Sequence, residues 1–241
     1  MSKKKPQFLA IIPARGGSKG VPRKNIRMLA DKPLVCHTIQ TALGSQYLDR
    51  IIVSTDDKEI AKISIECSAE VPFMRPEELA RDETATEPVL QHVVEWLNEK
   101  EGYCPEYVVL LQPTSPFLDS AVIDQGIEII QKETADSLLS VVEDRHFYWK
   151  LKDEQIQPEY TERKRRQELT PKFRENGALY ITKREILMKL HNRLGGKIAY
   201  VIMEEIDSIE IDTEFDFWLA EKIAAFKRIK RSEGKTQVKG K

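Results

Sequence analysis

Short apolar runs alternate with amphipathic stretches along most of the chain. Runs rich in Val, Ile and Leu predict strands, and apolar residues at helical spacing between them predict helices. The predicted strands are Phe8–Pro13, Arg50–Thr55, Val71–Met74, Tyr107–Leu111, Ser137–Glu143, Ala178–Thr182 and Ile198–Met203. The predicted helices are Pro33–Leu48, Lys58–Cys67, Pro88–Lys100, Ala121–Lys132, Glu185–Leu190 and a last helix that begins at Asp212 or Thr213 and ends near Lys230. This alternation favours parallel pairing through right-handed crossovers, and hence an α/β fold with a doubly wound, mostly parallel sheet.

The alternation stops between residues 144 and 174. This segment is polar, carries several aromatic residues and contains the basic run Arg163–Arg166. It is too long for an ordinary connection in a compact domain, and segments of this kind are usually functional. We therefore expect one domain over residues 1–226 with an excursion at 144–174. Residues 227–241 are basic and poor in apolar side chains, and we expect a disordered tail there.

Charge and composition argue against several classes of protein. The 38 basic and 39 acidic side chains nearly cancel, which disfavours nucleic-acid binding by bulk charge. No apolar run approaches the roughly 20 residues that span a membrane, and the first residues lack the features of a signal peptide, so we expect a cytoplasmic protein without a membrane partner. The basic residues Lys3–Lys5 are expected to be solvated. Cys36, Cys67 and Cys104 lie far apart in the sequence, which predicts buried free thiols in a reducing compartment.

The loop after the first predicted strand carries the strongest chemical signal. Ligands of doubly wound sheets bind beyond the carboxyl ends of strands, where this loop begins. It combines glycines, whose backbone N–H groups can approach phosphate oxygens, with four basic side chains, namely Arg15, Lys19, Arg23 and Lys24. It matches neither the P-loop pattern nor the dinucleotide fingerprint. A triphosphate site explains the charges, and the alternative is a glycine-rich turn with solvated basic residues.

The same loop, PARGGSKGVPRKN at residues 13–25, resembles the nucleotide-binding signature of the CMP-sialic acid synthetase family of cytidylyltransferases. Three further stretches match that family in order: LQPTSP at 111–116, RQEL at 166–169 with NGALYI at 176–181, and DSIEIDT at 207–213. The resemblance covers roughly residues 8–220 and implies a Rossmann-like nucleotidyltransferase. It also implies the reaction: transfer of CMP from CTP to the anomeric hydroxyl of N-acetylneuraminic or legionaminic acid, with release of pyrophosphate.

The resemblance assigns residues to the nucleotide. Arg15, Lys24 and Asp212 occupy catalytic positions. The positions expected to bind the nucleotide are Ala14, Gly16, Gly17, Ser18, Asn25, Arg75 and Thr86. The alternative for Arg75 is an ordinary arginine at a strand end, and the family often has Ser near the position of Thr86.

Gln112, Arg166 and Tyr180 are the candidates for binding the sugar. The planar guanidinium of Arg166 suits a carboxylate, although its basic neighbours also fit a solvated face. Gln112 is otherwise a turn residue, and Tyr180 is otherwise a buried strand tyrosine.

Glu210 and Asp212 are the candidate metal ligands. The alternating residues Ile209–Ile211 predict a further strand, which puts Glu210 and Asp212 on the same side, where they suit Mg²⁺ or Mn²⁺ together with substrate phosphate oxygens. The family commonly has Asp in place of Glu210, and Asp212 is alternatively the N-cap of the last helix. The general base remains open.

The resemblance further implies a homodimer in which residues 144–174 pack against a second subunit near the sugar site. Three alternatives stay open: activation of pseudaminic acid, activation of Kdo, and a non-catalytic nucleotide-binding protein on the same fold.

Overall fold

The computed structural model describes residues 6–238, with side chains as far as residue 229. Lys3–Lys5 and residues 239–241, on which predictions were made, lie outside the described residues. The core is a six-stranded sheet in the order β10-β6-β9-β5-β1-β4. Its strands are β1 (Phe8–Pro13), β4 (Leu48–Ser54), β5 (Tyr107–Leu111), β6 (Ser137–Asp144), β9 (Lys172–Lys183) and β10 (Ile198–Ile202). β9 runs antiparallel to both of its neighbours, and the other pairings are parallel.

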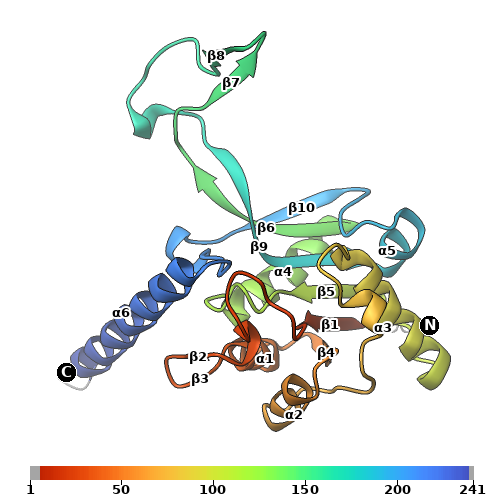
Figure 1. Ribbon diagram of the computed structural model, residues 1–241. Coiled ribbons are helices and arrows are strands. Elements are labelled where there is room, and N and C mark those ends of the chain that lie inside the picture. Colours follow the sequence, from red (N-terminus) through yellow and green to blue (C-terminus); the bar gives the residue numbers. More distant parts are fainter. Residues whose placement is uncertain (1–5, 239–241) are drawn as a thin grey trace.

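Helices cover both faces of this sheet (Figure 1). Alternate residues of β1 point to opposite faces and enter two separate cores. Ala10 and Ile12 pack with α1 (Leu34–Leu43), α2 (Lys58–Glu66) and α4 (Ser120–Glu133). Leu9 and Ile11 pack with α3 (Thr86–Glu101) and α5 (Arg184–Leu190). The predicted doubly wound, mostly parallel α/β fold is therefore confirmed.

A third, smaller core joins the last helix to the first part of the chain. α6 (Glu214–Val238) packs Phe217 and Ala220 against Leu29 and Leu34, beside the short hairpin of β2 (Met28–Leu29) and β3 (Lys32–Pro33). The helix continues to Val238 rather than ending near Lys230, so residues 227–238 of the expected tail are helical. None of the helices between residues 6 and 238 is both long and apolar enough to cross a membrane.

Residues 144–174 leave the sheet as an arm, visible at the top of Figure 1. β6 and β9 pair beyond the sheet as far as Asp144 and Lys172. The arm then carries the antiparallel hairpin of β7 (Trp149–Lys152) and β8 (Gln155–Pro158), all of whose residues are exposed, and the 3₁₀ turn η3 (Arg166–Glu168). The predicted break in the βα alternation is thus the point where one long hairpin leaves the domain.

Two predicted strands are wrong. Residues 71–74 form no strand, because the chain touches β4 through the single bridge between Glu70 and Ile52 and then turns so that Phe73 packs on Trp96. Residues 209–211 form none either: Ile211 donates one backbone hydrogen bond, 2.8 Å long, to the Thr114 carbonyl oxygen, and no ladder follows among the described residues.

The prediction of three free buried cysteines is also wrong. Cys36 and Cys67 form a disulfide, with Cα atoms 5.8 Å apart, and Cys104 is free and exposed. Cys36 lies on α1 and Cys67 directly follows α2, and these helices pack on the same face of the sheet. That packing brings together two positions separated by 31 residues, which sequence spacing alone does not show.

Candidate active site

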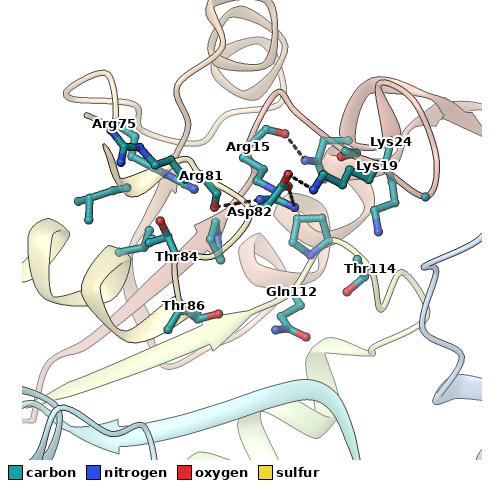
Figure 2. Close-up of a pocket in the computed structure, with 18 of the residues that line it drawn as sticks. Arg15, Lys19, Lys24, Arg75, Arg81, Asp82, Thr84, Thr86, Gln112 and Thr114 are labelled. Atoms are coloured by element: carbon teal, nitrogen blue, oxygen red, sulfur yellow. Dashed lines mark hydrogen bonds and ion pairs between the residues drawn. The ribbon is translucent and has the colours of Figure 1, made fainter. Parts of the chain in front are cut away.

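A cavity of about 350 Å³ opens beyond the carboxyl ends of β1 and β5 (Figure 2). Pro13 at the end of β1 and Gln112 directly after β5 form part of its wall. The loop after β1 and the segment between η2 (Glu77–Leu79) and α3 supply most of the remaining wall, and Asp212 reaches it from the start of α6. The cavity therefore lies where the topology of the sheet predicts a ligand.

The loop after β1 is held by its own polar contacts. The buried Asn25 amide donates to the Arg15 carbonyl oxygen at 2.9 Å, and the Gly16 amide donates to Asp56 Oδ1 at 2.9 Å. Asp57 caps α2 by accepting from the Glu59 and Ile60 amides, and it also pairs with Arg23. Burial disfavours the Asp57 carboxylate, but the hydrogen bonds from Arg23 and the two amides outweigh this and lower its pKa.

The cavity is lined with cationic groups. The Lys24 ammonium lies 2.6 Å from the Ile211 carbonyl oxygen and 3.2 Å from Asp212 Oδ1, so it ties the loop to the start of α6. The Arg15 guanidinium lies 2.8 Å from Asp82 Oδ1, and the Lys19 ammonium lies 2.5 Å from Asp82 Oδ2. These charges suit a ligand that carries several phosphates.

Arg75 is the most buried of these cations, with 6% of its surface exposed. Its Nε donates to Ser54 Oγ at 3.1 Å, and its guanidinium also donates to the Ser54 carbonyl oxygen. Burial lowers the pKa of Arg75 to about 10, partly offset by the charge of Asp56. No carboxylate forms an ion pair with Arg75 among the residues of the described part of the chain, so its remaining donors are available to a ligand.

The structure brings most of the predicted nucleotide residues together. Those that line the cavity are Arg15, Ser18, Lys24, Asn25, Arg75, Thr86 and Asp212. Arg75 and Lys24 lie on opposite sides of it in Figure 2. Ala14, Gly16 and Gly17 belong to the same loop but do not line the cavity.

The three residues predicted to bind the sugar lie in different parts of the structure. Gln112 lines the cavity beside Gly177, whose positive φ of 70° keeps the backbone close to both Gln112 and Glu210. Tyr180 is buried in the sheet, where burial and its hydrogen bond to Glu175 raise its pKa. Arg166 lies on the arm, 3.0 Å from His146 Nε2, and does not line the cavity of its own chain.

Sequence reasoning missed the segment that closes one side of the cavity. Arg81, Asp82 and Thr84 all line the cavity, and all three come from a polar loop without periodicity. The one available signal was position, because the loop joins two predicted binding residues, Arg75 and Thr86.

Glu210 and Asp212 form the carboxylate side of the site. Burial and then the charge of Asp212 raise the pKa of Glu210. Among the described residues, no group of three His, Cys, Asp or Glu side chains could hold a metal ion, and Glu210 forms no ion pair. The carboxylate of Asp212 at the cavity wall is a suitable ligand for Mg²⁺, which takes few protein ligands and completes its shell with water and substrate phosphate oxygens.

Together, a doubly wound sheet and a polycationic cavity beyond its first loop define an enzyme of the nucleotidyltransferase class. The family model described as cytidylyltransferase matches residues 9–239. The chain belongs to this cytidylyltransferase family.

Named relatives agree with this membership. The chain is 36% identical to the CMP-N,N'-diacetyllegionaminic acid synthase of Legionella pneumophila, over 90% of this chain and 96% of that protein. It is 34% identical to the N-acylneuraminate cytidylyltransferase A of Danio rerio, over 91% of this chain but only 51% of that protein. It is also 33% identical to the pseudaminic acid cytidylyltransferase of Campylobacter jejuni, over 71% of this chain and 76% of that protein.

Solved structures share the fold. A CMP:2-keto-3-deoxy-manno-octonic acid synthetase complexed with CTP superposes with a TM-score of 0.67 at 14% identity, covering 92% of this chain and 99% of that chain. The 4-diphosphocytidyl-2C-methyl-D-erythritol synthase of Anaerococcus prevotii superposes equally well, at 15% identity.

Proposed function

We propose that this protein transfers CMP from CTP to the anomeric hydroxyl of a nine-carbon acidic sugar, N-acetylneuraminic or legionaminic acid, and releases pyrophosphate. The observation that carries the proposal is the cationic cavity beyond the carboxyl ends of β1 and β5 in a member of the cytidylyltransferase family. The names of the Legionella and Danio relatives support the sugar class. The proposal keeps the expected cytoplasmic location, where a reducing environment would oppose the Cys36–Cys67 disulfide.

The cations divide into two groups by position. Arg15 and Lys19 converge on one point, where they suit the β- and γ-phosphates, and Lys24 lies near Asp212, where it suits the α-phosphate. The buried Arg75, with Asn25 and Thr86, is assigned to the cytidine moiety. In the reaction the sugar oxygen bonds to the α-phosphorus, and the bond to the β-phosphate bridging oxygen breaks. Arg15 would stabilise the charge that grows on the departing pyrophosphate.

Glu210 and Asp212 would hold a divalent cation, Mg²⁺ or Mn²⁺, beside the α-phosphate. Such an ion supplies charge neutralisation to the phosphate oxygens. The residues of this chain orient the ligands: the Lys24 contacts to Ile211 and Asp212 fix the position of the carboxylate side relative to the phosphate loop.

The sugar is assigned to the region of Gln112 and Gly177, next to Glu210. Arg166 is too far along the arm to line the cavity of its own chain, which favours a second subunit as its destination. The hairpin of the arm exposes Trp149, Leu151 and Ile156, with 75% of Leu151 exposed. Apolar side chains of this size on a projecting hairpin favour a homodimer in which the arm packs on the partner and presents Arg166 to the sugar carboxylate.

The test measures pyrophosphate release from CTP, ATP or GTP across a panel of N-acetylneuraminic, legionaminic and pseudaminic acids and Kdo. We expect CTP with one of the first two sugars to be preferred. The pseudaminic acid cytidylyltransferase of Campylobacter jejuni makes pseudaminic acid the alternative substrate. A preference for pseudaminic acid would show that the proposed sugar is wrong. CTP binding without pyrophosphate release from any sugar would instead support a non-catalytic nucleotide-binding protein.

A further inference from the structure

Asp82 occupies the centre of the phosphate cations. Each of its carboxylate oxygens faces a different cation, with Oδ1 2.8 Å from the Arg15 guanidinium and Oδ2 2.5 Å from the Lys19 ammonium. Figure 2 shows the three side chains meeting between Arg75 and Lys24. The Lys19 hydrogen bond and the Arg15 charge keep the pKa of Asp82 below its usual range, so the group is an anion near neutral pH. A carboxylate that bridges two cations stands where a phosphate would bridge them.

The fold of the neighbouring segment does not depend on this bridge. Ala80 donates to the Glu77 carbonyl oxygen, and the Thr84 hydroxyl donates to the Glu78 carbonyl oxygen at 3.0 Å, so the turn holds itself. Its hydrogen bonds and ion pairs to the loop after β1, among the residues the structure describes, are the two pairs of Asp82 and one bond from Arg15 to the Arg81 carbonyl oxygen. Asp82 is therefore a side-chain link between two separately folded loops.

The link is weak enough to be exchanged. The side chains of Arg15 and Asp82 are each about one-third exposed, at 32% and 33%, and that of Lys19 is 78% exposed. Ion pairs with this much solvent contact hold little free energy. A polyphosphate carries more negative charge than one carboxylate and accepts more hydrogen bonds, so it competes successfully for both cations.

We infer that Asp82 is an internal competitor of the polyphosphate: it holds Arg15 and Lys19 in the nucleotide-free protein and is displaced when the β- and γ-phosphates bind. The inference rests on the proposed assignment of these cations to the phosphates. Every ligand that reaches Arg15 and Lys19 must displace Asp82, whereas CMP, which ends at the α-phosphate, need not. Asp82 thereby weakens pyrophosphate binding and favours release of this product.

The test is direct binding by calorimetry, at fixed ionic strength, of inorganic tripolyphosphate, pyrophosphate, CTP and CMP. The variants are Asp82→Asn, Asp82→Ala and, as a matched control, Glu83→Gln, which removes one negative charge from the adjacent exposed position. Two exposed ion pairs correspond to roughly 2- to 30-fold in affinity. We expect tripolyphosphate, pyrophosphate and CTP to bind more tightly by about this factor in both Asp82 variants, with less than twofold change for CMP and for the control.

Unchanged or weaker polyphosphate binding in Asp82→Asn would overturn the inference, because Asp82 would then position Arg15 for the ligand rather than compete with it. An equal increase in the affinity for CMP would also overturn the inference, because the effect of Asp82 would then not be located at the β- and γ-phosphates. Thermal melting of each variant establishes whether it folds. If Asp82→Ala does not fold, the binding measurements on Asp82→Asn decide the outcome. Tripolyphosphate binding needs no sugar, so it tests the role of Asp82 separately from the proposed function. If the protein transfers no CMP but the Asp82 variants bind tripolyphosphate more tightly, the proposed function fails and the inference about Asp82 stands.

Discussion

Substituting Gly20 by Ala tests how closely the phosphate loop must approach the start of α6. A Cβ at Gly20 would lie 2.0 Å from the carbonyl oxygen of Asp212, whereas real Cβ contacts essentially never fall below 3.0 Å. Because the obstacle is backbone, one of the two segments must move by about 1 Å. The Lys24 contacts of 2.6 Å to Ile211 and 3.2 Å to Asp212 join the same two segments, so this shift stretches both of them.

The expected loss is mainly kinetic. A misplacement of about 1 Å at a reacting centre costs on the order of 100-fold in rate, which corresponds to about 2.7 kcal/mol of transition-state stabilisation. Overpacking of this kind also costs about 1–3 kcal/mol of folding stability, so we expect a melting temperature lower by several degrees but a folded protein. The assay is kcat/KM for CTP by pyrophosphate release, at a temperature well below the melting transition.

Gly17→Ala is the matched control, because Gly17 lies in the same loop but does not line the cavity, and a Cβ there meets nothing within 4 Å. It removes the same backbone freedom from the unfolded chain without a clash. If Gly20→Ala retains kcat/KM within twofold of Gly17→Ala, the close approach of the loop to Asp212 is not needed for catalysis, and the reasoning fails.

Three further predictions follow from the metal site, the disulfide and the arm. Removal of divalent cations with EDTA should abolish pyrophosphate release, and Mg²⁺ or Mn²⁺ should restore it; activity that persists would refute metal binding at Glu210 and Asp212. The Cys36–Cys67 disulfide joins residues separated by 31 positions and should contribute roughly 3–4 kcal/mol. A reductant should therefore lower the melting temperature of the native chain but not that of a Cys67→Ser variant, and equal shifts would show that the disulfide is not the cause. Light scattering should give about twice the 27.8 kDa monomer mass, and Arg166→Ala should raise KM for the sugar far more than for CTP; a fully active monomer, or equal rises in both constants, would contradict the proposed role of the arm.

The alternation of apolar runs predicted most of the sheet, because its central strands β1 and β5 are buried along nearly their whole length. Strand β1 was predicted at its observed residues for this reason. Residues 209–211 show where the argument fails: their pattern is that of a strand, but they have no partner ladder among the described residues. The local sequence shows that these residues favour an extended conformation. It does not show whether a neighbouring strand is available to pair with them.

The features missed in and around the site arise from contacts between distant segments. The Cys36–Cys67 disulfide requires that α1 and α2 pack on the same face of the sheet. Asp82 lies in a loop without periodicity. Its place in the site depends on ion pairs with Arg15 and Lys19, which are more than 60 positions away in the sequence. The loop after β1 could be predicted because its glycines and its charges are adjacent in sequence.

The arm grows out of two strands that are already paired. β6 and β9 are antiparallel neighbours within the sheet, so residues 145–171 between them are, topologically, the turn of a single hairpin. A turn can gain or lose residues two at a time, one on each strand, without changing the register of the sheet behind it. The reach of the arm can therefore change independently of the domain that carries the nucleotide cavity. In the proposed homodimer, the arm's reach would set the spacing between the two nucleotide cavities, and chimaeras that exchange the arm at Asp144 and Lys172 would change that spacing while leaving each cavity intact.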